Sequence, residues 1–224
     1  MRGDLGGLRQ WTERFTVASA ASLSLSLALV GVLGEGRLPV LVALFGFVCP
    51  MIFGMGYLLL PPYVGKTLVD DRLPGVHFVL AYAGAGLLVS GWVRDGTGAL
   101  FAVGAVTWAL GVAVFLTALV ATVAPVVWND PTAIVHGGDH PQRSTRLATA
   151  MLPLAIGYLG GGTVVLLQVA GLVGSGSWTA SQGLHLYAAG FGTLLILSLS
   201  ARLLLGFYHV ALPRTAVWVV LLSG

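Results

Sequence analysis

The sequence predicts an all-α protein, a polytopic transmembrane helical bundle with six complete spans and a truncated seventh. The first reason is composition, because 57% of the 224 residues are hydrophobic and only 8% are charged, with a mean hydropathy of +0.93. So few polar side chains cannot cover a water-soluble domain of this length. The second reason is a series of long uncharged runs. The third is that cations alternate between the ends of these runs.

Six apolar runs are long enough to cross the hydrocarbon core of a bilayer, which takes about 20 helical residues. The first run follows several arginines, as a signal peptide would, but it is longer than a signal core and no small-residue cleavage site precedes Glu35. We therefore interpret it as a retained span. The six runs are Phe15–Gly34, Leu38–Leu60, Val76–Val93, Gly98–Val127, Leu147 to about Val173, and Leu184–Tyr208.

A further apolar run, TAVWVVLLSG, follows Arg214 and reaches Gly224 after ten residues. This is about half the length of a span. We expect a seventh span that continues beyond Gly224 in a longer natural chain, and the alternative is a short interfacial tail. All the spans are assigned to one transmembrane helical domain, residues 1–224.

The cations predict the orientation of the spans. If the N-terminus is cytoplasmic, only Arg37 and Arg94 lie outside, which is a strong positive-inside bias. We therefore expect a multi-pass protein of the cell (plasma) membrane. The net charge of +3 includes no basic block, so the predicted partner is the lipid bilayer and nucleic acid is excluded. The cations on the inner side are Arg2, Arg9, Arg14, Lys66, Arg72, Arg143, Arg146, Arg202 and Arg214.

The second and sixth runs are similar to each other. The pair Gly46-Phe47 recurs as Gly190-Phe191, 144 residues later, and the match continues toward the inner end of each run. Both runs enter the membrane from the outer side. We predict an internal repeat with an offset of 144 residues. The alternative is chance similarity between two segments that are both dominated by small and aliphatic residues.

Two quoted segments carry a resemblance to a known group of proteins. HLYAAGFGTLLILSLSARLLLGF, which begins at His185, and LFGFVCPMIFGMGYLLLP, which begins at Leu44, resemble a helix pattern of NnrS-type membrane proteins and of the wider haem-copper oxidase subunit I-like group. In such families, histidines on helices bind haem iron or copper. The resemblance therefore implies respiratory or nitrogen-oxide redox chemistry, with His185 as the cofactor ligand. The matching position in the first segment is Leu41, so a second axial ligand has to come from elsewhere.

The other four histidines are candidate metal ligands on the inner side. Two of them lie close together in the loop sequence HGGDH, and imidazole together with carboxylate can bind zinc, copper or iron. The alternative is that they are ordinary polar residues of a solvated loop. Cys49 is the single cysteine, which excludes an intrachain disulfide. The four candidates are His77, His136, His140 and His209.

Small and polar residues inside the runs predict how the spans pack. The stretch AYAGAG at 81–86 and the pair Gly157 and Gly161 remove side-chain bulk, which lets helices approach closely in lipid. Gln168 and Thr163 are candidates for interhelical hydrogen bonds. Kinks are predicted at three prolines that lie within runs, namely Pro50, Pro125 and Pro153.

Two functional hypotheses of different class remain open. In the first, the protein is a redox protein that binds haem or copper through His185. In the second, it is a non-catalytic bundle that acts as a scaffold or assembly subunit, with other membrane subunits as partners. A bound cofactor requires His185 to face the bundle interior near another ligand. The scaffold hypothesis allows the same residue to lie among lipid headgroups.

Overall fold

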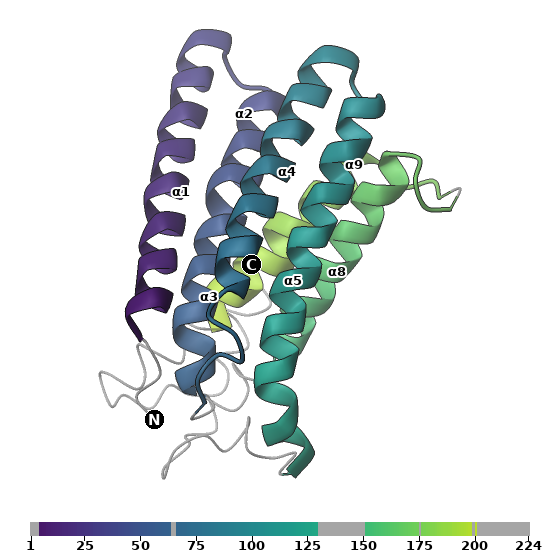
Figure 1. Cartoon of the computed structure of the whole chain (residues 1–224). Helices are drawn as coiled ribbons and strands as arrows, with labels where there is room; N and C mark the ends of the chain where they lie inside the picture. The colour runs from purple at the N-terminus through teal and green to yellow at the C-terminus, as the bar shows by residue number, and fades with distance from the viewer. Residues whose placement is uncertain (1–4, 64–65, 130–150, 175, 199, 201–224) are drawn as a thin grey trace, which may run out of the picture.

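The computed structural model describes residues 5–63, 66–129, 151–174, 176–198 and 200 (Figure 1). All regular structure in these ranges is helical. Two elements, η1 and η2, are π-helical segments, in which the backbone hydrogen bonds reach one residue further than in an α-helix. The elements are α1 (Leu5–Leu33), α2 (Arg37–Leu41), η1 (Val42–Val48), α3 (Cys49–Tyr63), α4 (Leu73–Asp95), α5 (Ala99–Asn129), α8 (Leu152–Val169), α9 (Ala180–His185) and η2 (Leu186–Thr193).

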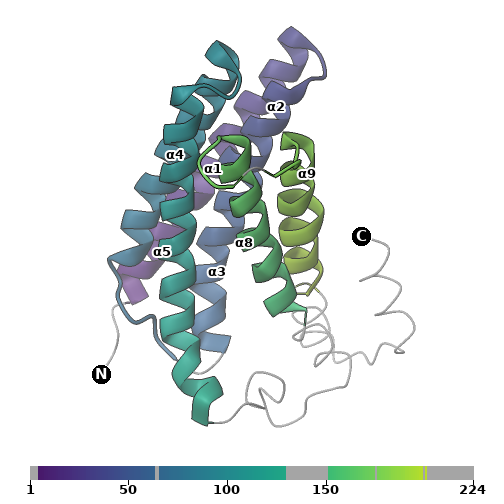
Figure 2. The same ribbon diagram turned by 90° about the vertical axis from the view of Figure 1, so that its right-hand side faces the viewer.

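The helices form an up-and-down bundle (Figures 1 and 2). Elements α2, η1 and α3 make one continuous helix that packs against α1, whereas α9 and η2 begin a second continuous helix that packs against α8. The antiparallel pair α4 and α5 lies beside both, since α4 contacts η1 and α5 contacts α8. The two π-helical segments also contact each other. They therefore lie where the first and last helix pairs meet.

Five of the described helices are long and apolar enough to cross a membrane, in agreement with the first five predicted runs. The predicted sixth span begins in α9 and is helical as far as Ser198. The predicted seventh lies outside the described residues. The structure thus shows a helical bundle of the membrane type, while the six-plus-one count stays a prediction. The five helices are Gly7–Leu33, Arg37–Pro61, Leu73–Arg94, Ala99–Pro125 and Leu152–Val169.

The start of the sixth helix differs from the prediction for a local reason. It begins at Ala180 instead of Leu184 because Thr179 and Gln182 form a capping box. The Thr179 hydroxyl oxygen accepts from the backbone N–H of Gln182 at 3.4 Å. The Gln182 side-chain oxygen accepts from the backbone N–H of Thr179 at 2.8 Å. Two backbone donors of the first turn are thereby satisfied, which lets polar residues open an otherwise apolar helix.

The prolines have different roles from those predicted. The predicted kink at Pro153 is wrong, because this residue lies in the first turn of α8. A backbone N–H group at that position would have no helical partner in any case. Pro125 does lie inside α5. Pro50 is the second residue of α3 and follows η1 directly. In a regular α-helix, the ring of a proline clashes with the backbone carbonyl four residues earlier. The wider π-helical turn immediately before Pro50 avoids this clash.

The π-helical segments occupy matched positions in the two similar runs. Segment η1 begins at Val42 and η2 at Leu186, 144 residues apart, which is the offset of the predicted repeat. In η2 no proline follows, but the Thr193 hydroxyl donates to the carbonyl of Ala188, five residues earlier, at 3.0 Å, which is the spacing of a π-helical turn. This match supports the repeat, which itself stays a prediction. Because π-helical turns concentrate at functional sites, the region between the two segments is the first place to look for a site.

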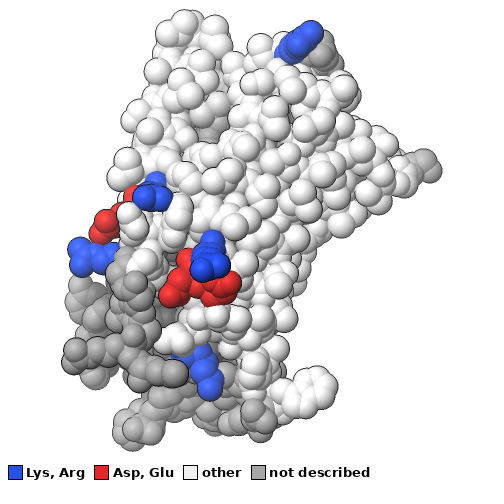
Figure 3. Space-filling view, viewed as in Figure 1, with Lys and Arg blue, Asp and Glu red and all other residues white. Residues whose placement is uncertain are grey.

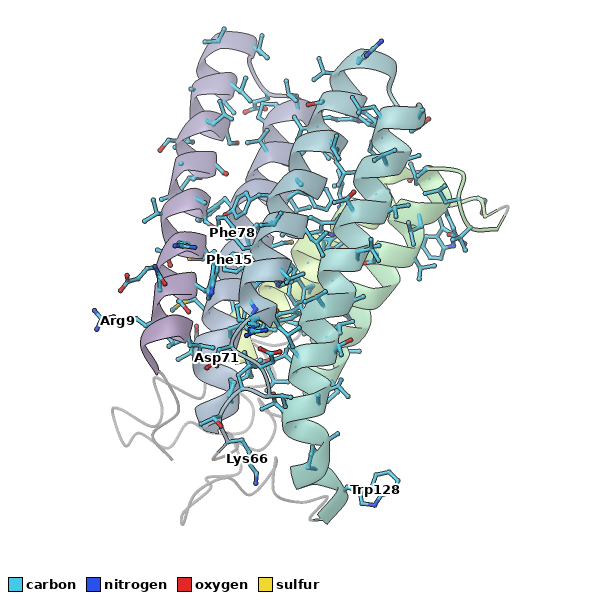
Figure 4. The ribbon with its side chains drawn as sticks, viewed as in Figure 1. Arg9, Phe15, Lys66, Asp71, Phe78 and Trp128 are labelled. Carbon is cyan, nitrogen blue, oxygen red and sulfur yellow. The ribbon has the colours of Figure 1, made fainter. Side chains whose placement is uncertain are left out.

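Aromatic side chains fill the interior of the bundle. One set of rings, which we call the aromatic column, is less than 2% exposed throughout. Neighbouring ring centroids lie 4.8 Å apart for Phe45 and Trp108, and 4.6 Å apart for Phe53 and His77. Figure 4 shows Phe15 beside Phe78 at the edge of the column. The column consists of Phe15, Phe45, Phe53, Tyr57, His77, Trp108, Phe115, Tyr187 and Phe191.

Glycines bring α4 and α5 into backbone contact, as the stretch AYAGAG predicts. A methyl group added at Gly84 would lie 2.7 Å from the backbone nitrogen of Trp108, and one added at Gly104 would lie 2.6 Å from that of Leu88. The prediction for Gly157 and Gly161 has a different outcome. Both lie on α8, and no described atom lies within 4 Å of a methyl group added at either position. Close packing therefore holds between α4 and α5, whereas this face of α8 is open within the described structure.

Charged side chains gather toward one end of the bundle. In Figure 3 most of the charged groups on the visible face lie toward the lower end, below a broad surface without charged residues. Lys66, labelled in Figure 4, lies at that end. Arg37 and Arg94 lie at the opposite end, where α2 begins and α4 finishes. We call this the outer end, following the predicted orientation, and the cytoplasmic location of the N-terminus stays a prediction.

Candidate functional site: the outer pocket

A pocket opens at the outer end, where the two π-helical segments face each other. Segment η1 contributes Phe45 and η2 contributes Tyr187, and α2, α4, α5, α8 and α9 supply the remaining walls. The pocket, which we call the outer pocket, is a shallow and partly open recess, with interior room for about one water molecule. Its main apolar walls are Leu41, Phe45, Trp92, Phe101, Val165 and Val169.

A chain of buried hydrogen bonds holds Tyr187 in place beside the pocket. The Thr163 hydroxyl donates to the carbonyl of Leu159 at 2.8 Å, so its oxygen is left to accept from the Tyr187 hydroxyl, also at 2.8 Å. The Tyr187 oxygen in turn accepts from Nε1–H of Trp108 at 3.0 Å. Every polar group has a partner, which favours a rigid network. The interhelical role predicted for Thr163 is confirmed, whereas the side-chain oxygen of Gln168 has no hydrogen-bond partner among the described atoms.

Arg37 lies at the mouth of the outer pocket and is its one charged lining residue among those described. The side chain is exposed. Its guanidinium carbon lies 5.6 Å from the centre of the Trp92 ring, a distance at which the cation and the negative ring face attract each other. The mouth of the pocket therefore carries a positively charged group held above an aromatic wall.

His185, the predicted cofactor ligand, lies outside the pocket. It is exposed, and its Nδ1 lies 2.8 Å from the carbonyl oxygen of Ser181, one helical turn earlier. Because a carbonyl can only accept, Nδ1 carries the proton and the lone pair is left on Nε2. This tautomer suits a metal-binding histidine, which usually donates its other N–H to a carbonyl. The free nitrogen belongs to an exposed side chain.

His77 lies inside the aromatic column and is fully buried. Its Nδ1 is 3.1 Å from the Tyr57 hydroxyl, and its Nε2 has no hydrogen-bond partner among the described atoms. The ring of Phe53 is 4.6 Å away, and those of Phe115 and Phe15 are 5.5 Å and 5.6 Å away. Such neighbours suit an uncharged imidazole packed as an aromatic side chain. The other predicted metal ligands, His136, His140 and His209, lie outside the described residues.

Within the described residues, side chains fill the space between the helices, and this part of the interior does not fit a macrocyclic cofactor. The aromatic column occupies the space between the helices, and Cys49 is buried there as a free thiol. Across residues 5–63, 66–129, 151–174 and 176–198, no group of three histidine, cysteine or acidic residues could hold a metal ion. The structure thus leaves His185 as an isolated ligand candidate on the outer surface and places it apart from His77.

Sequence reasoning selected His185 and missed Tyr187, although only one residue separates them. Successive residues of a helix are rotated by about 100°, so these two side chains point in nearly opposite directions. Tyr187 is buried and lines the pocket, whereas His185 is exposed. One sequence feature could have indicated the pocket. The cation Arg37 and the aromatic residues Trp92 and Phe101 all lie at the predicted outer ends of apolar runs.

Fold and site together define a class: a helical bundle of the membrane type with a shallow apolar pocket at one end. Comparison with known proteins found no matching family model, no matching curated protein and no matching solved structure. The function is therefore argued from the pocket itself.

Proposed function

We propose that this protein is a membrane-embedded binding protein and that the outer pocket is its ligand site. The observation that carries the proposal is the lining of this recess at the outer end, which is framed by both π-helical segments. Its walls are apolar and aromatic, and one charged group, Arg37, is placed at its mouth. Ligand sites typically combine an apolar lining with a few polar groups in this way.

The chemistry of the lining favours binding over catalysis. Among the described lining residues, the hydroxyl groups are those of Ser181 and Tyr187. The Tyr187 hydroxyl is already engaged by Trp108 and Thr163. A nucleophile needs an adjacent base that activates it, and no described lining side chain supplies one. The proposal therefore agrees with the hypothesis that the protein is a non-catalytic bundle, and it adds that the bundle binds a ligand.

Filling the pocket is expected to abolish binding of an apolar probe. Val169 lines the pocket, so the larger ring of Val169→Trp would occupy the space that a ligand needs. The measurement is the fluorescence of the neutral probe N-phenyl-1-naphthylamine titrated with the full chain in a non-ionic detergent. We expect saturable binding to the unmodified protein and a loss of at least about ten-fold in affinity for Val169→Trp, or about 1.4 kcal/mol.

The matched control is Val164→Trp on the same helix. Val164 is 48% exposed and faces away from the pocket, so the same substitution adds a ring without filling the cavity. Its probe affinity should equal that of the unmodified protein. If both variants bind the probe equally well, or if the unmodified protein shows no saturable site, the outer pocket is not a ligand site.

Redox chemistry is the second candidate function, and the state of His185 supports it. Its Nδ1–H donates to the Ser181 carbonyl, which leaves the lone pair of Nε2 on the outer surface to bind a metal. The resemblance of this helix to haem- and copper-binding families points to the same residue. A haem on His185 would supply one-electron chemistry, and its second ligand would have to come from outside the described residues or from another chain.

An optical spectrum separates the two candidate functions. If the protein is a haem protein, the purified full-length chain will show a Soret band that shifts on reduction with dithionite and is lost in His185→Ala. If it is a non-catalytic binding protein, the spectrum will show no such band and metal analysis will be blank. A Soret band that survives His185→Ala would contradict the role of His185 while keeping the haem, and His185→Met, which retains a ligand atom, is the conservative comparison.

A further inference from the structure

We propose that a second copy of this chain packs against the outward face of α1, so that two α1 helices form the contact. This interaction goes beyond the proposed ligand site and does not depend on it. It follows from three features of α1: its exposure, the charges at its inner end, and the small side chains along the rest of the face. The outward face, as we use the term, consists of the exposed residues Arg9, Glu13, Ala20, Ser24, Leu27 and Gly31.

Helix α1 lies at the edge of the bundle (Figure 1) and is the least buried of the five candidate spans. Of the residues in its most apolar stretch, 11% are buried, against 33% or more in each of the other four spans. Its inner side packs on α2, η1, α3 and α4 and carries Phe15 and Ser19, which are both 0% exposed. The opposite side has no neighbour in the described part of the chain. Helix α1 therefore has room for one more helix.

The charges at the inner end of the outward face favour a second copy as the partner. The Nε of Arg9 lies 2.9 Å from the Oε1 of Glu13, and the two side chains are 80% and 61% exposed. In Figure 4, Arg9 points away from the bundle. The face thus carries one positive and one negative group, one helical turn apart, and is complementary to itself. A guanidinium has five N–H donors, so Arg9 can bind the Glu13 of its own helix and that of a second copy together.

The direction of insertion determines how two copies can meet. All copies of a membrane protein are inserted in the same orientation, so a symmetric pair has its two-fold axis along the membrane normal. The two α1 helices then run parallel. Arg9 and Glu13 are about 6 Å apart along the helix axis at 1.5 Å per residue, a distance that two long side chains on facing helices can span. Because the same face is used by both copies, the contact closes as a dimer.

Small side chains allow the two backbones to approach each other above the charges. Ala20, Ser24 and Gly31 follow one another at intervals of four and seven residues, which keeps them on one side of the helix. A methyl group added at Gly31 meets no described atom within 4 Å. The Ser24 hydroxyl donates to the Ala20 carbonyl at 3.1 Å, and its oxygen can still accept from the serine of a second copy. Small residues and hydroxyl groups are typical of helix contacts in lipid.

Cysteine cross-linking tests the contact in membranes of cells that express the full chain. Ser24→Cys places a thiol on the outward face. Leu25→Cys is the matched control, since Leu25 is 54% exposed and lies at the same depth, about 100° further round the helix. Cys49 is 0% exposed and should not react. After oxidation with copper phenanthroline, we expect at least about five-fold more disulfide-linked dimer from Ser24→Cys, because close helix contact is specific to one face. Equal amounts from the two variants would overturn the proposal.

Reversal of the charges tests whether the partner is a second copy. Arg9→Glu gives the face two negative groups and Glu13→Arg gives it two positive groups, so each variant should pair poorly with itself. The two variants are complementary to each other. Each also carries Ser24→Cys, and they are coexpressed with tags of different size, so that a gel separates mixed dimers from like dimers. We expect the mixed dimer to exceed either like dimer at least about five-fold, because facing like charges repel. The ratio that random pairing produces would contradict the self-complementary contact and overturn the proposal.

Discussion

Replacement of Trp108 by alanine is expected to lower the free energy of unfolding by about 3–5 kcal/mol, the usual cost of removing a buried tryptophan. Trp108 is 1% exposed, lies 4.8 Å from the Phe45 ring centroid, and donates its Nε1–H to Tyr187 at 3.0 Å. Alanine would leave a cavity in the aromatic column and remove a donor from the Tyr187 hydroxyl. The same variant should weaken binding in the outer pocket, because Tyr187 would no longer be held in position.

The single cysteine provides the measurement. Cys49 is 0% exposed, so a maleimide should label it only when the bundle opens, and the SDS concentration at half-labelling reports stability. The matched control is Trp128→Ala, since Trp128 is 90% exposed near the inner end of α5 (Figure 4). Its half-labelling point should match that of the unmodified protein. Equal shifts in the two variants would contradict the buried position of Trp108.

Replacement of Gly84 by alanine is expected to destabilise the bundle by about 1–3 kcal/mol, the range for overpacking a close contact. The added methyl group would lie 2.7 Å from the backbone nitrogen of Trp108 and 2.8 Å from its Cα. Neither atom can move without shifting α5 as a whole. This cost opposes the gain of about 1 kcal/mol that alanine brings to a helix interior, and the clash should dominate.

Gly86 provides the control for this substitution on the same helix. A methyl group added there meets nothing within 4 Å among the described atoms. Gly86→Ala should therefore leave the Cys49 labelling point unchanged or raise it slightly, through the higher helix propensity of alanine. A stable Gly84→Ala, or equal destabilisation of both variants, would show that α4 and α5 do not approach each other as closely as the structure has them.

The sequence by itself determined the class of the protein and the course of most of its helices. A chain with 8% charged residues has too few polar groups to face water, and the length of each uncharged run follows from the thickness of a bilayer. The similarity around Gly46 and Gly190 coincides with the two π-helical segments, since Gly46 lies in η1 and Gly190 in η2, but the sequence predicted no π-helical register. Local polar chemistry was missed in one case, where Thr179 and Gln182 cap the sixth helix earlier than hydropathy suggests.

Only the tertiary structure decided which residues form a site. His185 and Tyr187 lie close together in the sequence, but the rotation of the helix places them on different sides. His185 lies on the outer surface, and Tyr187 lines the pocket. His77 is a candidate metal ligand in the sequence, yet packing surrounds it with Tyr57, Phe53 and Phe115. The outer pocket combines residues from helices that are far apart in the chain, from Arg37 to Tyr187. Such a site depends on how helices rotate and pack against one another. In a sequence this apolar, the faces of a helix have similar hydropathy, so the sequence does not show which face lies against a neighbouring helix.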